Sequence, residues 1–266
     1  MEQDREGHSR DGADQSHVLD LDDGAVFTID RPSKLNSVTN RVLSDLEACL
    51  DCLEGRGASL LVIRGSGERA FCAGTDLAEL QALSHEQQVA KCNRARDLMI
   101  RLSRSPLVSV AAVNGLAFGA GMELAMSCTL RLAAPSAVFA LPEIKLGLLP
   151  AYAGTQMLPA IVGPSRALEI MLTGREVPAE EAQAIGLVHR ILDDGAELDA
   201  AALAFGRSVT RHGAAASRAI RDCVAAFGEG GMSAGLQAEA EAVRAVFDTP
   251  EARARLAAFL DKKGAG

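Results

Sequence analysis

Residues 107–126 read LVSVAAVNGLAFGAGMELAM, and this segment is the most informative part of the chain about its fold. Its first seven residues form an apolar run that is typical of a buried strand. Asn114-Gly115 then turns the chain, and residues 120–127 indicate a helix that is entered through Gly119 and Gly121. The pattern therefore predicts a strand, a glycine-rich turn and a helix in direct succession.

The start of this predicted helix offers unpaired backbone N–H groups, because the first turn of a helix has no carbonyl partners for them. Together with the helix dipole they favour a nearby negative charge, such as a carbonyl oxygen that becomes an enolate. Glu123 follows one turn later between apolar neighbours, where we expect a carboxyl pKa raised toward ~6–7 that suits acid–base catalysis. A glutamate on a solvated helix face is the alternative that this segment alone leaves open.

Two further segments place polar groups in an apolar setting. Glu143 lies in the proline-bounded stretch FALPEIKLGLLP at 139–150. Two acids on rigid apolar elements are able to divide the acid and base roles if they share a pocket. The loop FCAGTD at 71–76 opens toward a helix, and we predict that it presents a second backbone N–H group. A plain strand-to-helix connection is the alternative for this loop.

The composition limits the classes of partner. The 266 residues carry a formal net charge of −8, with one Tyr and no Trp. We therefore expect an aliphatic core, and neither nucleic-acid binding nor membrane attachment. No apolar run reaches the ~18 residues that a bilayer requires. Residues 1–15 are charged and lack the apolar segment of a secretory signal, so we predict a disordered tail.

Six cysteines are scattered along the chain. Cys49 and Cys52 form a C-x-x-C pair, but a helical pattern surrounds them without a second pair or a nearby histidine. We interpret them as ordinary helix residues rather than a redox or zinc site, and we predict no metal. Scattered cysteines without a secretory signal indicate a reducing compartment, so we expect a cytoplasmic protein.

Strands and helices alternate over the first two-thirds of the chain, which indicates an α/β core. From about residue 198 the pattern becomes entirely helical and rich in Ala. We therefore predict a core over 16–195 and a C-terminal helical region over 196–266 that docks on the core or serves oligomerisation. Within the core we predict a hairpin at 18–29, strands at 59–65, 130–133 and 138–140, and helices at 39–53, 150–162, 166–172 and 179–185.

Together these motifs resemble the enoyl-CoA hydratase/isomerase (crotonase) family over about residues 16–263. The matching segments, in order, are Arg31-Pro32 with Leu35-Asn36, FCAGTD at 71–76, Asn114 to Met126, Pro142-Glu143-Ile144, and Gly147 to Gln156. The resemblance implies an α/β fold built as a spiral of ββα units. It also implies a C-terminal helical part that builds homotrimers, often paired into hexamers.

The resemblance further implies a hydratase-type site. Glu123 is expected to deprotonate the water that attacks Cβ of a 2-enoyl-CoA, and Glu143 to share that water and protonate Cα. The backbone N–H groups of Thr75 and Ala120 are expected to form an oxyanion hole; members usually have glycine at the second position, but alanine keeps the N–H. The implied enzyme is a hydro-lyase of fatty-acid β-oxidation. It needs no cofactor, because coenzyme A is part of the substrate.

The same resemblance implies where coenzyme A binds. The family uses the loop around Leu35 and Ser37 and the backbone near Ala73 for the adenine end. Lys34 is adjacent and is expected to meet a phosphate, with a solvated lysine as the alternative.

A second group of residues completes the expected substrate site. Phe259 and Lys262 resemble a C-terminal pair that reaches coenzyme A from a neighbouring subunit, with helix packing and a surface position as the alternatives. Asp76 and Gly119 are expected to line the substrate site beside the oxyanion hole.

Two positions depart from the family pattern. Thr129 follows Cys128 where members commonly have Asp, so we expect a supporting charge near the site to be missing. Tyr152 interrupts the usual Pro-Gly-Ala-Gly-Gly stretch. It is expected to shape acyl specificity or to add a hydroxyl to the chemistry, with a position in the core as the alternative.

Three functions follow from these residues. Hydration of a 2-enoyl-CoA leads, because both acids are retained. Double-bond isomerisation, or another acyl-CoA reaction of the family, is the second hypothesis, although isomerases generally need one acid. A non-catalytic acyl-CoA-binding scaffold is the third, and loss of an acid would mark it. His189 lies outside the motifs and is predicted to be structural.

Overall fold

The structure is a computed structural model that describes residues 15–192 and 197–264. The predicted tail over 1–15 lies outside the described residues, with the exception of Gln15. The carbonyl of Gln15 accepts a 2.9 Å hydrogen bond from Asp30 N. The chain therefore pairs with the first hairpin from the first residue that the structure describes.

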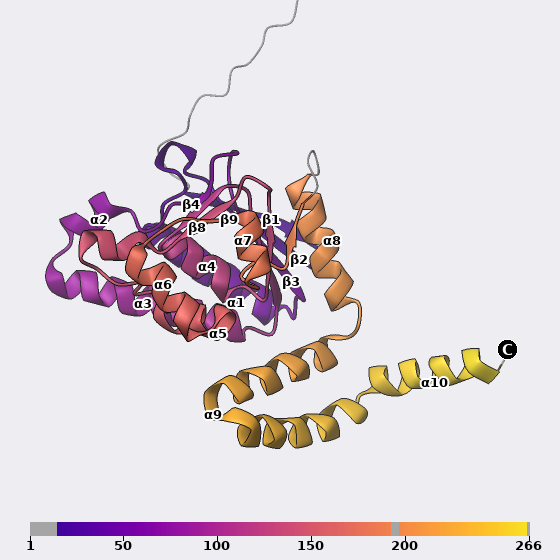
Figure 1. The fold of residues 1–266 in the computed structure, drawn as a ribbon. Coiled ribbons are helices and arrows are strands. Elements are labelled where there is room, and N and C mark those ends of the chain that lie inside the picture. Colours follow the sequence, from indigo (N-terminus) through magenta and orange to yellow (C-terminus); the bar gives the residue numbers. More distant parts are fainter. Residues whose placement is uncertain (1–14, 193–196, 265–266) are drawn as a thin grey trace, which may run out of the picture.

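Two sheets form the body of the molecule (Figure 1). The larger has the order β1-β2-β3-β5-β7-β10, and its strands are parallel except for the β1–β2 hairpin. Its strands are β1 (Ser16–Leu21), β2 (Gly24–Ile29), β3 (Leu60–Gly65), β5 (Val108–Val113), β7 (Leu130–Ala133) and β10 (Arg190–Ile191). The smaller sheet contains β4 (Ala70–Cys72), β6 (Leu116–Phe118), β8 (Val138–Ala140) and β9 (Val177–Pro178), of which β9 is antiparallel.

The helices complete repeated turns of the chain. They are α1 (Asn40–Gly55), α2 (Leu77–Ala82), α3 (His85–Arg104), α4 (Ala120–Ser127), α5 (Gly154–Val162), α6 (Pro164–Thr173), α7 (Ala179–Ala184), α8 (Leu198–Thr210), α9 (Ala214–Phe247) and α10 (Pro250–Gly264), with 3-10 turns η1 (Pro32–Lys34) and η2 (Pro142–Leu146). The turns that begin at β3, β5 and β7 each add one strand to the larger sheet, one strand to the smaller sheet and then helical structure, as in β5, β6 and α4. The predicted spiral of ββα units is thus confirmed.

Asparagine and glycine fix the corners between successive turns of the spiral. Asn36 is fully buried and donates through Nδ2 to Ala70 O at 2.7 Å. Asn114 donates to Gly67 O at 2.7 Å from the next corner. A Cβ at Gly115 would lie 2.4 Å from the Arg69 carbonyl oxygen, so no other residue allows the two backbones to come so close.

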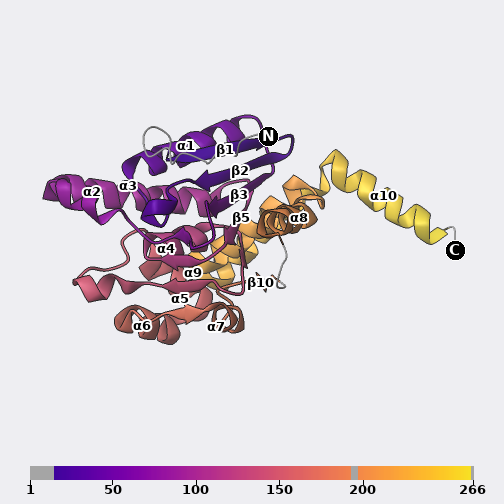
Figure 2. The same ribbon diagram turned by 90° about the horizontal axis from the view of Figure 1, so that it is seen from above.

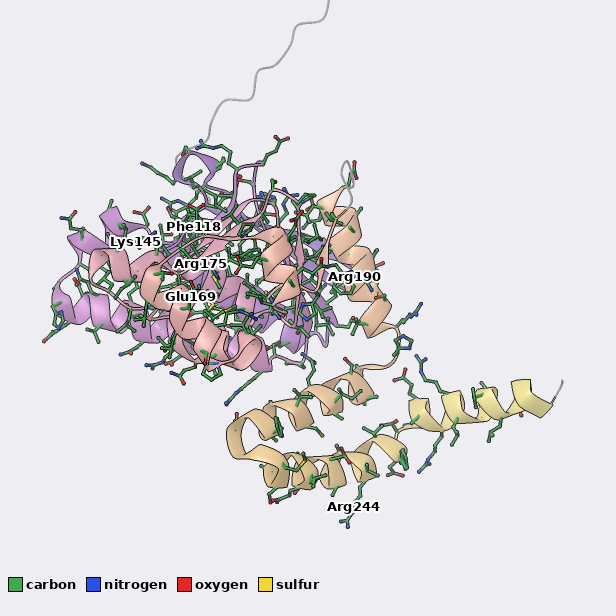
Figure 3. All side chains as sticks on the ribbon, viewed as in Figure 1. Phe118, Lys145, Glu169, Arg175, Arg190 and Arg244 are labelled. Atoms are coloured by element: carbon green, nitrogen blue, oxygen red, sulfur yellow. The ribbon has the colours of Figure 1, made fainter. Side chains whose placement is uncertain are left out.

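The two faces of the larger sheet pack against different layers. On β3, Leu61 and Ile63 belong to the main core with α1, α3 and α4, whereas Leu60 and Val62 face α8. This alternation follows from the two-residue period of a strand. At the edge of the layer, the Arg190 guanidinium lies 4.3 Å from the centre of the Phe205 ring, which attaches β10 to α8 (Figure 3).

The last two helices lie outside this body (Figures 1 and 2). Arg221 of α9 donates to the carbonyl oxygens of Ser105, Pro106 and Leu107, and α9 kinks at Gly231 with φ 70° and ψ −163°. Beyond the kink Arg244 projects away from the sheets (Figure 3). Exposed apolar side chains line both helices, namely Ile220, Val224, Phe227, Met232, Leu236, Val243, Phe247, Leu256, Phe259 and Leu260. The assignment of this region to oligomerisation stays a prediction.

Several predicted boundaries were wrong, and short elements account for them. The segment 71–76 begins inside β4, and β6 occupies part of the predicted glycine-rich turn. Strands of two or three residues are too short to show a period of two in the sequence. Helix α5 starts at Gly154 rather than at residue 150, because Ala153 has φ 81° and cannot continue a helix. The proline-bounded stretch at 139–150 contains the end of β8 and the 3-10 turn η2.

Gly206 provides a test of how α8 docks on the sheet. A Cβ at this position would lie 2.3 Å from Leu60 Cδ1 and 3.2 Å from Val110 Cγ2, both of which are buried. We expect Gly206→Val to lower the free energy of unfolding by about 1–3 kcal/mol, because α8 must move off the sheet. Urea unfolding measures the change. Gly55→Val is the matched control, since a Cβ there has nothing within 4 Å; equal losses in both variants would contradict this packing.

Candidate active site

Glu123 lies at the centre of the site, on a helix whose eight residues are all buried. Only 1% of the residue is exposed. Its Oε1 accepts hydrogen bonds from Tyr152 N and Gly154 N, both at 2.8 Å. Ala153 between them adopts φ 81°, and this left-handed residue turns both N–H groups toward one oxygen. The predicted alternative of a solvated Glu123 is therefore wrong.

Glu143, on η2, lines the same cavity as Glu123. A Cβ at Gly119 would lie 2.7 Å from Glu143 Oε1, which places this carboxylate against the start of α4. Glu143 Oε2 is buried and has no hydrogen-bond partner among the described residues. The two glutamates, 20 residues apart in the sequence, thus meet at one cavity.

Burial dominates the electrostatics of this acid pair. It raises the pKa of Glu123 to about 8; the Gly154 N–H opposes the shift, the charge of Glu143 adds to it, and the Tyr152 N–H opposes it. Burial also raises the pKa of Glu143. Two carboxyls with raised pKa values in one cavity retain a proton between them in the neutral range. The pair is therefore able to supply an acid and a base together.

Two backbone N–H groups beside the acids have no partner in the described part of the chain. Ala73 N donates to Leu35 O and Asp76 N to Val38 O, both at 2.9 Å, which leaves Thr75 N between them unpaired. Ala120 N is the first N–H of α4 and is also unpaired. A Cβ at Gly74 would lie 3.9 Å from Ala120 N, so the two segments are neighbours. The geometry fits a pair of donors for one oxygen atom.

The cavity has a volume of about 510 Å³. Glu123, Glu143, Thr75, Ala120 and Gly119 line it together with an apolar wall. That wall comes from α2, α3, the last residue of η2 and the segment after it, through Leu77, Leu80, Val89, Cys92, Leu146, Leu148 and Leu149. Sequence reasoning did not find these residues. The available signals were two leucines one helical turn apart and the LGLL run at 146–149, whose Leu149 is 63% exposed.

Tyr152 belongs to the cavity wall, and its residue is only 3% exposed. Its hydroxyl lies 2.9 Å from Thr75 Oγ1 in a hydrogen bond, and burial raises the pKa of this phenol. The side chain is therefore both buried and part of the site. A role in acyl specificity stays a prediction.

The residues expected at coenzyme A lie in two places. Leu35 and Ala73 are joined by the backbone hydrogen bond given above, and Lys34 beside them is exposed. The Arg31 guanidinium contacts Ser37 Oγ at 2.9 Å and Asp76 Oδ2 at 2.8 Å. Asp76 also caps α2, so its carboxylate already has protein partners. Sequence reasoning missed that Arg31 holds this loop together.

Phe259 and Lys262 lie on α10, which extends away from the sheets (Figure 1) and contributes no residue to the cavity wall. Phe259 is 56% exposed, whereas the side chain of Lys262 lies outside the described residues. The expected contact with coenzyme A bound to a neighbouring subunit stays a prediction.

The far end of α4 is structural. Thr129 N donates to Ser109 Oγ at 2.9 Å, and Thr129 is not part of the cavity wall. The buried Arg131 guanidinium binds Leu187 O at 2.6 Å and Cys128 O at 2.8 Å. His189 Nδ1 accepts from Arg131 N, and burial followed by the charge of Arg131 lowers the pKa of His189 to about 4. The prediction that His189 is structural agrees with these contacts.

The described residues contain neither a metal-binding cluster nor a membrane-spanning helix. Over 15–192 and 197–264, no cluster of three or more His, Cys, Asp or Glu residues is arranged to hold a metal ion. In the same part of the chain, every helix is too short or too polar to cross a membrane. Cys49 is buried and Cys52 exposed on α1, and both are free thiols.

A ββα spiral with one buried and one half-buried glutamate and two unpaired N–H groups on one cavity defines an α/β protein of the crotonase fold. Solved structures agree with this class. An enoyl-CoA hydratase from Bacillus anthracis superposes with a TM-score of 0.88 at 30% identity, covering 94% of this chain and 97% of that one. DspI from Pseudomonas aeruginosa also superposes with a TM-score of 0.88, at 32% identity, covering 97% of this chain and 98% of the DspI chain.

Sequence comparisons identify the family. The enoyl-CoA hydratase/isomerase family model matches residues 24–265. A probable enoyl-CoA hydratase from Bacillus subtilis is 34% identical over 241 residues, which is 90% of this chain and 93% of that protein. A crotonyl-CoA hydratase from Syntrophomonas wolfei is 34% identical over 247 residues, which is 91% of this chain and 93% of that protein. The chain belongs to the enoyl-CoA hydratase/isomerase family.

The buried Glu123 carboxyl predicts how stability depends on pH. Its pKa is raised from an ordinary 4.5 to about 8, so the folded chain holds a proton that the unfolded chain releases. The free energy of unfolding therefore falls as the pH rises between these values. Glu123→Gln removes this contribution. We expect the free energy of unfolding of the variant to equal that of the wild type near pH 4.5. Near pH 8 it should exceed the wild-type value by on the order of 2–4 kcal/mol.

Urea unfolding at several pH values measures this difference. Glu180→Gln, on the exposed surface of α7, is the control. Its difference in free energy of unfolding from the wild type should be the same at every pH. A Glu123→Gln variant that is less stable than the wild type near pH 8 would show that the carboxylate is stabilising where it lies.

Proposed function

We propose that the protein is an enoyl-CoA hydratase that adds water reversibly, in the syn sense, to a 2-trans-enoyl-CoA thioester. The observation that carries the proposal is the meeting of Glu123 and Glu143 at one cavity, beside the unpaired N–H groups of Thr75 and Ala120. Relatives whose names include enoyl-CoA hydratase and crotonyl-CoA hydratase support it. An acid, a base and an oxyanion site are the groups that hydration of a conjugated thioester requires.

In the proposed reaction the thioester oxygen accepts hydrogen bonds from Thr75 N and Ala120 N. The reacting form of the pair has Glu123 ionised and the shared proton on Glu143. It is the minor form in the free protein at neutral pH, because burial raises the pKa of Glu123 to about 8. Glu123 takes a proton from water while the water oxygen forms a bond with Cβ. The electrons of the double bond move to Cα and the thioester oxygen, and the N–H pair stabilises that charge. Glu143, which holds the proton of the pair, delivers it to Cα. The product is a 3-hydroxyacyl-CoA, and the proton gained by Glu123 restores the starting charge of the pair.

The hydrogen bonds at Glu123 suit this role. Its Oε1 is occupied by Tyr152 N and Gly154 N, which orients the carboxylate and leaves Oε2 as the base. Water, the two acids and the substrate carbonyl complete the reaction, so we propose that no separate cofactor takes part. Coenzyme A enters as part of the substrate.

We also propose a homotrimer or a dimer of trimers, with a role in fatty-acid β-oxidation. The exposed apolar side chains of α9 and α10 support assembly, because water-exposed apolar stripes are usually covered by a partner. The six free thiols support the reducing cytoplasm as the compartment.

Crotonyl-CoA provides the direct test. We expect the wild type to hydrate it, as measured by the loss of enoyl absorbance. Glu123→Gln and Glu143→Gln should each lower kcat by about 10²–10⁴-fold, because each removes one proton-transfer group without changing the shape of the cavity. Glu180→Gln serves again as the control and should retain full activity.

The outcomes separate the hypotheses. Wild-type turnover that survives in Glu123→Gln would reject the assigned base. Migration of the double bond in a 3-enoyl-CoA, without hydration of the 2-enoyl isomer, would replace hydratase by isomerase. Tight binding of crotonyl-CoA with neither reaction would favour the acyl-CoA-binding scaffold.

A further inference from the structure

Tyr152 is the residue that touches both halves of the site. Its backbone N–H donates to Glu123 Oε1 at 2.8 Å, and its hydroxyl is hydrogen-bonded to Thr75 Oγ1 at 2.9 Å. It is also the only tyrosine in the chain. A single buried residue thus connects the proposed base with the proposed oxyanion donor.

We propose that Tyr152 and Thr75 form a positioning pair, in which the hydroxyl–hydroxyl hydrogen bond holds the Thr75 N–H where the thioester oxygen of the substrate gathers charge. The inference rests on the proposed hydration. It goes beyond it by assigning the side chains of both residues, whereas the oxyanion hole itself needs only the backbone of Thr75.

The contacts on the opposite side of Thr75 show why a second tether matters. Val38 N donates to Gly74 O at 2.8 Å and Asp76 N donates to Val38 O at 2.9 Å, so the backbone on both sides of Thr75 is attached to Val38. Gly74 itself has φ 110°, in the region that favours glycine, so no side chain of its own holds the peptide that carries the Thr75 N–H. The bond to Tyr152 restrains Thr75 from the cavity side.

Tyr152 is itself firmly held, which makes it a suitable anchor. Its backbone is fixed by Glu123, Ala153 follows in a left-handed conformation, and the residue is buried in the cavity wall. An aromatic ring has two side-chain torsions, so little freedom remains once it is packed. An oxyanion donor displaced by a fraction of an ångström loses much of its effect on the transition state.

The test compares variants that differ by single groups. Tyr152→Phe removes the hydroxyl and keeps the ring, Thr75→Val removes the partner hydroxyl at nearly constant shape, and Thr75→Ser retains it. Thr173→Val, which removes an exposed hydroxyl at the end of α6, is the control. The readouts are kcat and KM for crotonyl-CoA and the near-ultraviolet absorbance of the enolate of bound acetoacetyl-CoA.

We expect Tyr152→Phe and Thr75→Val each to lower kcat about tenfold, which corresponds to about 1.4 kcal/mol, with KM nearly unchanged. Both should also reduce the enolate fraction of bound acetoacetyl-CoA. Thr75→Ser keeps the hydroxyl and should retain most of the wild-type kcat and most of the wild-type enolate fraction. The double variant should lose no more than either single variant, because both remove the same hydrogen bond.

Wild-type kcat and wild-type enolate in Tyr152→Phe would overturn the inference, as would losses that multiply in the double variant. Tyr152→Phe alone is sufficient for the decision if Thr75→Val does not fold. A wild type that forms the enolate but hydrates no enoyl-CoA would defeat the proposed function. The enolate measurements on the variants would still decide the positioning pair.

Discussion

The backbone of α4 touches the backbone of β4, and the site depends on this contact. A Cβ at Gly121 would lie 2.0 Å from Cys72 O, a separation that no side chain permits. Gly119, with φ 50°, lets the chain leave β6 and enter the helix at once. Because α4 begins against the 72–75 segment, Ala120 N and Thr75 N become neighbours. Consecutive turns of the spiral thus place one donor each beside the same cavity.

The close packing around α4 also determines the pKa of Glu123. Glu123 is deep enough for burial to raise the pKa of its carboxyl, while two N–H groups around Ala153 limit that rise. Neither burial nor these hydrogen bonds alone would bring the pKa of Glu123 close to neutral pH. At the other end of α4, the Arg131 guanidinium binds the carbonyl of Cys128, where a cation complements the helix dipole. Both ends of the short helix that carries Glu123 are therefore fixed by groups from other turns.

The sequence predicted the fold best where elements are long or punctuated by glycine. β5, the turn at 114–115 and α4 lie within a residue of their predicted positions, because an apolar run and a helix start leave clear signals. The three-residue strands β4 and β6 left none. The meeting of Glu123 and Glu143 followed from resemblance rather than spacing. The left-handed Ala153 was not predictable, since alanine rarely adopts that conformation, and the leucines of the cavity wall lie in elements too short or irregular to reveal which face they present.

The position of Tyr152 gives the molecule an unusual optical property. The chain contains one tyrosine and no tryptophan, so its intrinsic fluorescence originates almost entirely from a ring in the wall of the proposed active site. In most proteins such emission is an average over many environments. Here light absorbed by that ring reports on the hydrogen bond at its hydroxyl and on whatever enters the cavity beside it. The unmodified protein thus carries a built-in optical reporter of its own binding site.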